Sequence, residues 1–139
     1  MKKAIMVSIV TCLACIMSCK SQAPKNPLTE AYESLLRAMG DTSLSLYQRD
    51  RATKMLLKGD SGVIPVLITG LSDKRVYNPK VERPSSTSDK PEYYVETVGM
   101  KCDDLLKNIV FESSRDPRAG NVDWKKWWDE NKNRINANK

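Results

Sequence analysis

Apolar residues recur at helical spacing in two stretches of the chain, and both stretches use the same offsets of 0, 4, 7, 8 and 11. The first consists of Leu28, Tyr32, Leu35, Leu36 and Met39, and the second of Val98, Cys102, Leu105, Leu106 and Ile109. At about 100° per residue, each set falls within an arc of about 100° on an α-helix. The pattern therefore predicts two amphipathic helices, each with one face that must be covered.

Residues that start or stop helices flank both stretches. Asn26 and Pro27 fit the N-cap and first position of the first helix, and Gly40 fits its end. Thr97 is placed to cap the second helix.

Because Cys102 lies in the middle of an apolar stripe, we expect a small buried thiol rather than a nucleophile.

Two further helices are expected between these stretches. Residues 44–58 carry Ala52, Met55 and Leu56 along one side. Residues 63–71 are rich in branched side chains, as buried strands are, but Pro65 cannot donate a sheet hydrogen bond. We therefore expect a short buried helix there, capped by Ser61 or Asp60.

The C-terminal stretch predicts a last helix, capped by Asn121 or Asp123. Three tryptophans and one isoleucine share an arc of about 100°, at Trp124, Trp127, Trp128 and Ile135. Three indoles on one face suit either a platform for stacking sugars or peptides, or a lid over the core. The lid is favoured because a tryptophan buries roughly 150–250 Å², which a small domain needs.

Residues 74–92 contain three prolines and a run of serine and threonine, so we expect a long, exposed, irregular loop. Such a loop either binds a partner or is only an insertion between helices. The candidate partner-binding residues are Lys74, Arg75, Tyr77 and Arg83.

The stretch RATKMLLKGDSGVIPVLITGLSDKR, residues 51–75, resembles a HEAT-like helical repeat. The matching positions are Arg51, Ala52, Leu56, Leu57, Gly59, Val63, Ile64, Pro65, Leu67, Leu71 and Asp73. The resemblance covers little more than one repeat and implies an all-α fold. We expect a short HEAT-like α-α superhelix of about two imperfect helix pairs, in one domain over residues 27–139 with the irregular loop inside it.

The N-terminus has the outline of a secretion signal. Lys2 and Lys3 precede an uncharged run of 14 residues, 4–17, which is shorter than the roughly 20 that a membrane-spanning helix needs. We expect residues 1–18 to be removed as a signal peptide and residues 19–26 to form a flexible tether.

The run Ile16-Met17-Ser18-Cys19 resembles the lipobox of bacterial lipoproteins. The resemblance implies that Cys19 receives a diacylglycerol and a further fatty acid such as palmitate, and becomes the first residue. Cys15 is a second-choice site, and an ordinary secreted protein with Cys19 free or cross-linked is the alternative. Lys20 after the cysteine implies transfer to the outer membrane, on its periplasmic or surface face, rather than retention in the inner membrane.

Removal of the expected signal peptide lowers both the number of cysteines and the formal charge of the chain. Removing residues 1–18 from the 139 leaves 121 residues, and loss of Lys2 and Lys3 lowers the formal charge from +6 to +4. Cys102 is then the only cysteine besides the lipidated Cys19, so an internal disulfide or a cysteine-held zinc is excluded.

The chain contains no histidine, which removes the commonest general base and excludes Ser-His-Asp and Cys-His arrangements. We therefore expect no catalytic residues, no cofactor and no metal. Nucleic acid is not an expected partner, because the basic residues are scattered among acids and export separates the chain from it.

These observations predict a membrane-anchored lipoprotein that binds proteins or peptides in the bacterial cell envelope without catalysis. Its expected partners are membrane lipid, through acylated Cys19, and an envelope protein or peptide. Two alternatives stay open: an immunity-type inhibitor of an exported toxin, and a module that binds cell-wall glycan through Trp124 or Trp127.

Overall fold

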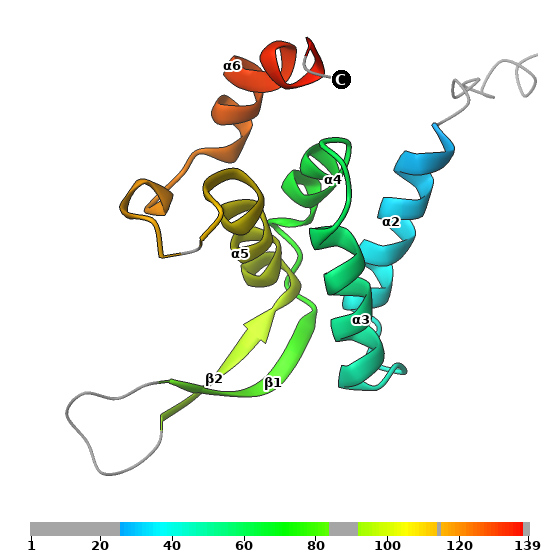
Figure 1. The fold of residues 1–139 in the computed structure, drawn as a ribbon. Coiled ribbons are helices and arrows are strands. Elements are labelled where there is room, and N and C mark those ends of the chain that lie inside the picture. Colours follow the sequence, from blue (N-terminus) through cyan, green and yellow to red (C-terminus); the bar gives the residue numbers. More distant parts are fainter. Residues whose placement is uncertain (1–25, 84–91, 114, 138–139) are drawn as a thin grey trace, which may run out of the picture.

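The computed structural model describes residues 26–83, 92–113 and 115–137. Cys19, the expected signal peptide of residues 1–18 and nearly all of the expected tether lie outside these residues. The described part contains five α-helices, one short 3₁₀ helix and one two-stranded antiparallel sheet. The expectation of an all-α superhelix is therefore wrong, and the fold is mixed α and β (Figure 1).

The first two helices lie side by side. Helix α2 (Pro27–Met39) begins at the Asn26 cap, whose side chain accepts from Leu28 N at 3.0 Å, and ends at Gly40, as predicted. Helix α3 (Leu46–Leu57) begins with a capping box, in which Ser45 and Gln48 each bond the other's backbone.

Helix α4 (Val63–Gly70) is the short buried helix that Pro65 predicted. Its N-cap is Gly62, not Ser61 or Asp60, and the helix start has no side-chain cap. Asp60 instead turns the preceding loop, where its carboxylate accepts from Gly62 N at 2.8 Å and from the Tyr32 hydroxyl at 3.2 Å.

The largest departure from expectation is a β-hairpin, whose first strand lies within residues 74–92, where an irregular loop was predicted. Strand β1 (Val76–Arg83) pairs with β2 (Glu92–Thr97), and residues 84–91 between them lie outside the described part. Two register shifts interrupt the ladder between Val76 and Val81. These shifts accommodate Pro79, since a proline lacks an N–H and is tolerated in edge strands and at bulges.

Two side chains hold the hairpin against the helices. Tyr77 is buried in the core, and Arg49 of α3 donates from Nη1 to the carbonyl oxygens of Val76 and Tyr77. Both the burial of Tyr77 and the hydrogen bonds from Arg49 involve residues far away in the chain. The local pattern of residues 74–92 therefore predicts neither of them.

Helix α5 (Val98–Phe111) follows β2 without a break, and Thr97 caps it as predicted, accepting from Met100 N at 3.3 Å. A 3₁₀ turn, η1 (Pro117–Ala119), leads to α6 (Trp124–Ala137). The Asp123 carboxylate accepts from Lys126 N at 3.0 Å at the start of α6, which matches one of the two predicted caps.

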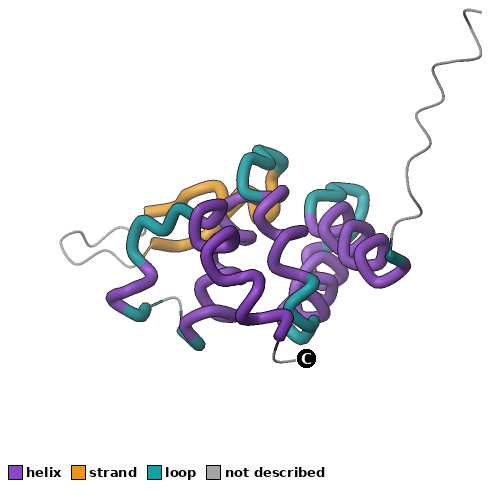
Figure 2. The backbone as a smooth tube through the Cα atoms, turned by 90° about the horizontal axis from the view of Figure 1, so that it is seen from above, coloured by secondary structure: helices purple, strands orange, loops and turns teal. Residues whose placement is uncertain are grey.

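The core lies where α2, α3, α4 and α5 meet, and α6 closes one end of it (Figures 1 and 2). Its fully buried side chains are Met39, Leu56, Val63, Leu67, Val98, Cys102 and Leu106. Trp124 is buried, and Trp127 and Trp128 pack half-buried against the same cluster. The prediction of a tryptophan lid is thus confirmed, and Trp124 offers no open face for stacking.

Candidate functional site

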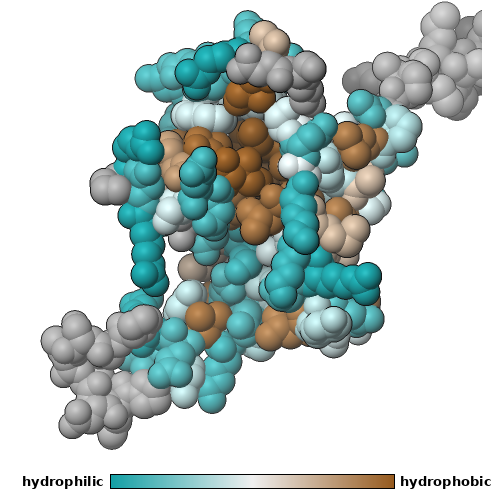
Figure 3. Space-filling view, viewed as in Figure 1, coloured by the Kyte–Doolittle hydropathy of each residue, from teal (hydrophilic) through white to brown (hydrophobic). Residues whose placement is uncertain are grey.

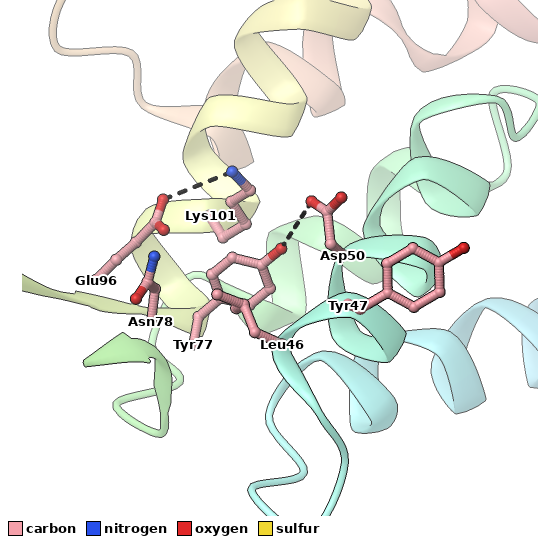
Figure 4. Close-up of a pocket in the computed structure, with 7 residues that line it drawn as sticks. All are labelled: Leu46, Tyr47, Asp50, Tyr77, Asn78, Glu96 and Lys101. Carbon is pink, nitrogen blue, oxygen red and sulfur yellow. Dashed lines mark hydrogen bonds and ion pairs between the residues drawn. The ribbon is translucent and has the colours of Figure 1, made fainter. Parts of the chain in front are cut away.

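A pocket of about 360 Å³ opens where the start of α3, the base of the hairpin and the start of α5 meet. We call it the hairpin pocket, and it is lined by Leu46, Tyr47, Asp50, Tyr77, Asn78, Glu96 and Lys101 (Figure 4). The lining comes from four elements, so the fold assembles this site from parts of the chain that are distant in sequence.

Tyr77 forms the floor of the hairpin pocket. Its hydroxyl donates to the Asp50 carboxylate at 3.3 Å (Figure 4). The Thr53 hydroxyl lies 3.2 Å from the Tyr77 hydroxyl. Burial raises the pKa of Tyr77 above its ordinary value, so the phenol stays protonated and keeps donating at neutral pH. The pKa of Asp50 is lowered, chiefly by its bond to Lys54, so its carboxylate is ionised.

Glu96 and Lys101 contribute opposite charges to the lining of the pocket. Glu96 is only 8% exposed, and its carboxylate is 3.6 Å from the Lys101 ammonium, which is a long ion pair. The same ammonium lies 5.2 Å from the centre of the Tyr77 ring. Burial raises the pKa of Glu96, Lys101 opposes this rise, and nearby Asp104 adds to it.

The rim of the pocket is apolar and open. Leu46 is 42% exposed and Tyr47 is 76% exposed, and the Tyr47 ring points away from the other lining side chains (Figure 4). A ligand that enters the pocket would therefore contact the apolar and aromatic rim first and the hydrogen-bonding side chains deeper in the pocket. Binding sites commonly combine apolar contact area with a few polar groups in this way.

Replacing Glu96 by glutamine tests the electrostatic account of this ion pair. The folded-state pKa of Glu96 is raised, so its ionised form costs stability at neutral pH, and this cost disappears as the pH falls through the folded value toward the unfolded one. E96Q should therefore be the more stable chain at neutral pH, with the gap narrowing on acidification. Urea unfolding of both chains across that pH range measures the difference in their free energies of unfolding. If the parent chain lost stability relative to E96Q on acidification, this electrostatic account would be contradicted.

The structure separates the four candidate residues taken from the sequence. Tyr77 lines the hairpin pocket, but Lys74 is exposed in the turn before β1. Arg75 binds Asp73 through its guanidinium and reaches the Arg37 carbonyl at the end of α2. Arg83 lies at the other end of β1, with its guanidinium 5.5 Å from the centre of the Tyr94 ring.

Sequence reasoning missed six of the seven residues that line the pocket. One local signal did exist, because Glu92-Tyr93-Tyr94-Val95-Glu96-Thr97 is rich in residues that favour strands.

Cys102 is buried in the core, and burial raises the pKa of its thiol to about 12. We expect iodoacetamide at pH 8 to modify Cys102 roughly a thousandfold more slowly in the folded chain than in the unfolded chain, because so little thiolate is present. Mass spectrometry of the peptide that contains Cys102 measures this. Equal rates with and without denaturant would show that the thiol is accessible.

A second groove, of about 320 Å³, lies between α4, α5 and α6 and is more apolar. Its lining includes Ile64, Ile109, Val110, Trp127 and Ile135, and Figure 3 shows apolar surface over this part of the molecule. We place the candidate site in the hairpin pocket because that pocket combines an exposed apolar rim with a buried carboxylate, Glu96, and two further charged side chains, Asp50 and Lys101.

Across residues 26–83, 92–113 and 115–137, no helix is both long and apolar enough to cross a membrane. In the same part of the chain, no three side chains of histidine, cysteine, aspartate or glutamate lie together in a way that could hold a metal ion.

No protein-family model matches this chain, and neither a curated protein nor a solved structure matches it significantly.

Proposed function

We propose that this protein is a lipid-anchored, non-catalytic binding protein of the bacterial cell envelope that holds a peptide or a segment of another protein in the hairpin pocket. The observation that carries the binding proposal is the exposed Leu46 and Tyr47 rim in the same pocket as the buried Glu96, which forms a long ion pair with the partly exposed Lys101. The lipobox-like run that ends at Cys19 supports the anchor.

Two features of the hairpin pocket favour a peptide or protein segment. Tyrosine is enriched among the residues that dominate protein interfaces, because one ring offers both a large apolar face and a polar hydroxyl. Across the pocket from Tyr47, the Glu96 carboxylate and the Lys101 ammonium are 3.6 Å apart, which is long for an ion pair (Figure 4). Backbone amides or side chains of a partner would complete their hydrogen bonds, which favours binding at this position.

The anchor is tested by labelling cells that express the full chain with radioactive palmitate. We expect label on the parent chain and on C15A, and none on C19A. C19A should also leave the membrane fraction, because stable anchoring requires the acyl chains. Label that persists on C19A would refute the anchor at this position.

The binding role is tested with a photo-crosslinking amino acid placed at Tyr47 in the living cell. The same amino acid at Met55 is the matched control, since Met55 lies on the same helix, is 52% exposed and does not line the pocket. We expect a discrete cross-linked product from position 47 that is absent from position 55. Equal products from both positions, or none from position 47, would refute binding at the hairpin pocket.

A further inference from the structure

The groove of about 320 Å³ between α4, α5 and α6 takes no part in the proposed peptide binding. All three helices contribute apolar side chains to its lining, which are Ile64, Ile109, Val110, Trp127 and Ile135. A volume of this size lies near the lower end of the range of ligand pockets. Because burial of apolar groups drives binding to such a lining, the groove suits a narrow, apolar ligand with few polar atoms.

One polar side chain in the groove lacks a hydrogen-bond partner. Asp60 accepts from the Tyr32 hydroxyl, and Arg134 donates to the Asn131 side chain at 2.9 Å. The hydroxyl oxygen of Ser61 is buried, and no partner for it lies among the described residues. A buried hydroxyl is costly when it is left unpaired. A ligand with one carbonyl oxygen at the end of an apolar chain would accept from Ser61 and fill the remaining apolar space.

The described chain starts close to the Ser61 end of the groove. The Tyr32 hydroxyl, in the second turn of α2, donates to the Asp60 carboxylate at 3.2 Å and accepts from Asp60 N at 3.1 Å. Pro27 begins the same helix, about 7.5 Å from Tyr32 along the helix axis. Figure 1 shows the start of α2 and the end of α6 towards the same end of the molecule.

The length of chain outside the described part is short enough to bring Cys19 to this groove. Residues 19–25 separate Cys19 from the first described residue, Asn26. Seven residues span at most about 25 Å when they are fully extended. A group attached to Cys19 is therefore within reach of Asp60 and Ser61.

We propose that this groove holds one acyl chain of the lipid on Cys19 of the same molecule, with the acyl carbonyl oxygen accepting from the Ser61 hydroxyl. The inference rests on the proposed anchor and adds a binding site for it within the protein. A short tether gives the attached group a millimolar effective concentration, which favours it over a free fatty acid or a second copy of the chain. The remaining acyl chains of Cys19 stay in the bilayer, where two chains give stable anchoring.

An acyl chain in the groove would also orient the domain on the membrane. The groove is lined by residues near the end of α6, whereas the hairpin extends from the opposite end of the molecule (Figure 1). The hairpin pocket lies at the base of the hairpin, between the starts of α3 and α5. The α6 end would then face the bilayer, and the hairpin pocket would face away from it, towards a partner.

The test uses cells that express the full chain and are fed a palmitate analogue carrying a diazirine. The analogue is attached to Cys19 and forms cross-links to its surroundings under ultraviolet light. Mass spectrometry of the purified chain then locates the products. We expect an intrachain product that joins the lipid of Cys19 to a peptide containing Ile64, Val110 or Trp127. Products with phospholipid alone, or between two copies of the chain, would overturn the proposal.

The V110W variant fills the groove with a larger side chain, since Val110 is half-buried in its lining. V95W is the matched control, because Val95 lies on the hairpin and is 50% exposed. We expect V110W to lower the yield of the intrachain product several-fold and V95W to leave it unchanged. Circular dichroism shows whether both variants are folded, and I135W replaces V110W if that variant is not. Equal yields from a folded groove variant and V95W would refute the site.

The S61A variant tests the position of the acyl carbonyl. Because it removes the donor, the intrachain product should fall a few-fold, as expected for the loss of one hydrogen bond. An unchanged yield would show that the carbonyl lies elsewhere.

The C19A variant separates this inference from the proposed function. When the free analogue is added to purified C19A at the protein's own concentration, we expect little label in the groove. Label as strong as in the parent chain would assign the groove to free fatty acids and refute the tethered occupant. If the parent chain carries the analogue on Cys19 but gives no product in the groove, this inference fails and the anchor stands. If Cys19 carries no analogue, the anchor itself fails.

Discussion

Replacing Trp124 by alanine should lower the free energy of unfolding by about 3–5 kcal/mol, the range typical of a buried tryptophan or phenylalanine replaced by alanine. Trp124 is 3% exposed, and its ring packs 6.1 Å from Phe111 and 5.9 Å from Trp127, measured between ring centres. Its indole N–H also donates to Asp103 at 2.7 Å. The variant therefore loses apolar contact and a hydrogen bond together.

Urea unfolding followed by far-ultraviolet circular dichroism measures this loss without relying on tryptophan fluorescence. W128A is the matched control, since Trp128 lies on the same helix but is only half-buried, and it should cost clearly less. If W124A changed stability by no more than a typical surface substitution, roughly 0.5 kcal/mol, the lid would contribute little to folding.

The helices could be predicted because each one carries its own local evidence. The apolar positions of α2 and α5 repeat at the same offsets, and their caps, Asn26 and Thr97, lie at the expected ends. The backbone hydrogen bonds of a helix form within one segment of the chain. The spacing of its apolar residues and its capping residues can therefore both be found in one short stretch of sequence.

The hairpin could not be predicted in the same way, because a strand depends on a partner elsewhere. Within β1 only Tyr77 is buried, so the chain shows no clear alternation of apolar and polar residues there. Pro79 argued against a strand, yet in a two-stranded ribbon its missing N–H costs little beside a register shift. What holds β1 in place is Arg49, which lies 27 residues before the first carbonyl that it bonds.

The candidate site was harder to predict than the hairpin, because its charged residues lie on three different elements: Asp50 on α3, Glu96 on β2 and Lys101 on α5. Asp50 belongs to α3 and Glu96 to β2, and both line the same pocket as the buried Tyr77. Of the lining residues, the sequence suggested only Tyr77 as a candidate, because the exposure of Tyr47 and the burial of Glu96 are properties of the folded chain.

Gly99 provides a second sharp test of the fold, because it allows α5 to approach the turn after α4. A Cβ atom at this position would lie 2.3 Å from the Leu71 carbonyl oxygen and 3.1 Å from that of Asp73. Both are backbone atoms, and the Asp73 carbonyl also accepts from Gly99 N at 2.9 Å. Neither neighbour can move without shifting the connection between α4 and the hairpin.

We expect G99A to lower the free energy of unfolding by about 3 kcal/mol, near the upper end of the usual cost of overpacking. Helix propensity alone predicts the opposite sign, a gain of roughly 0.5–1 kcal/mol, so the direction of the change identifies its cause. G40A is the matched control, because the three atoms nearest to its new Cβ all belong to the guanidinium of Arg75, a flexible side chain. Its cost should stay within about 1 kcal/mol. If G99A were as stable as G40A, the close approach of α5 to the Leu71 carbonyl would be wrong, and with it the position of Lys101 at the hairpin pocket.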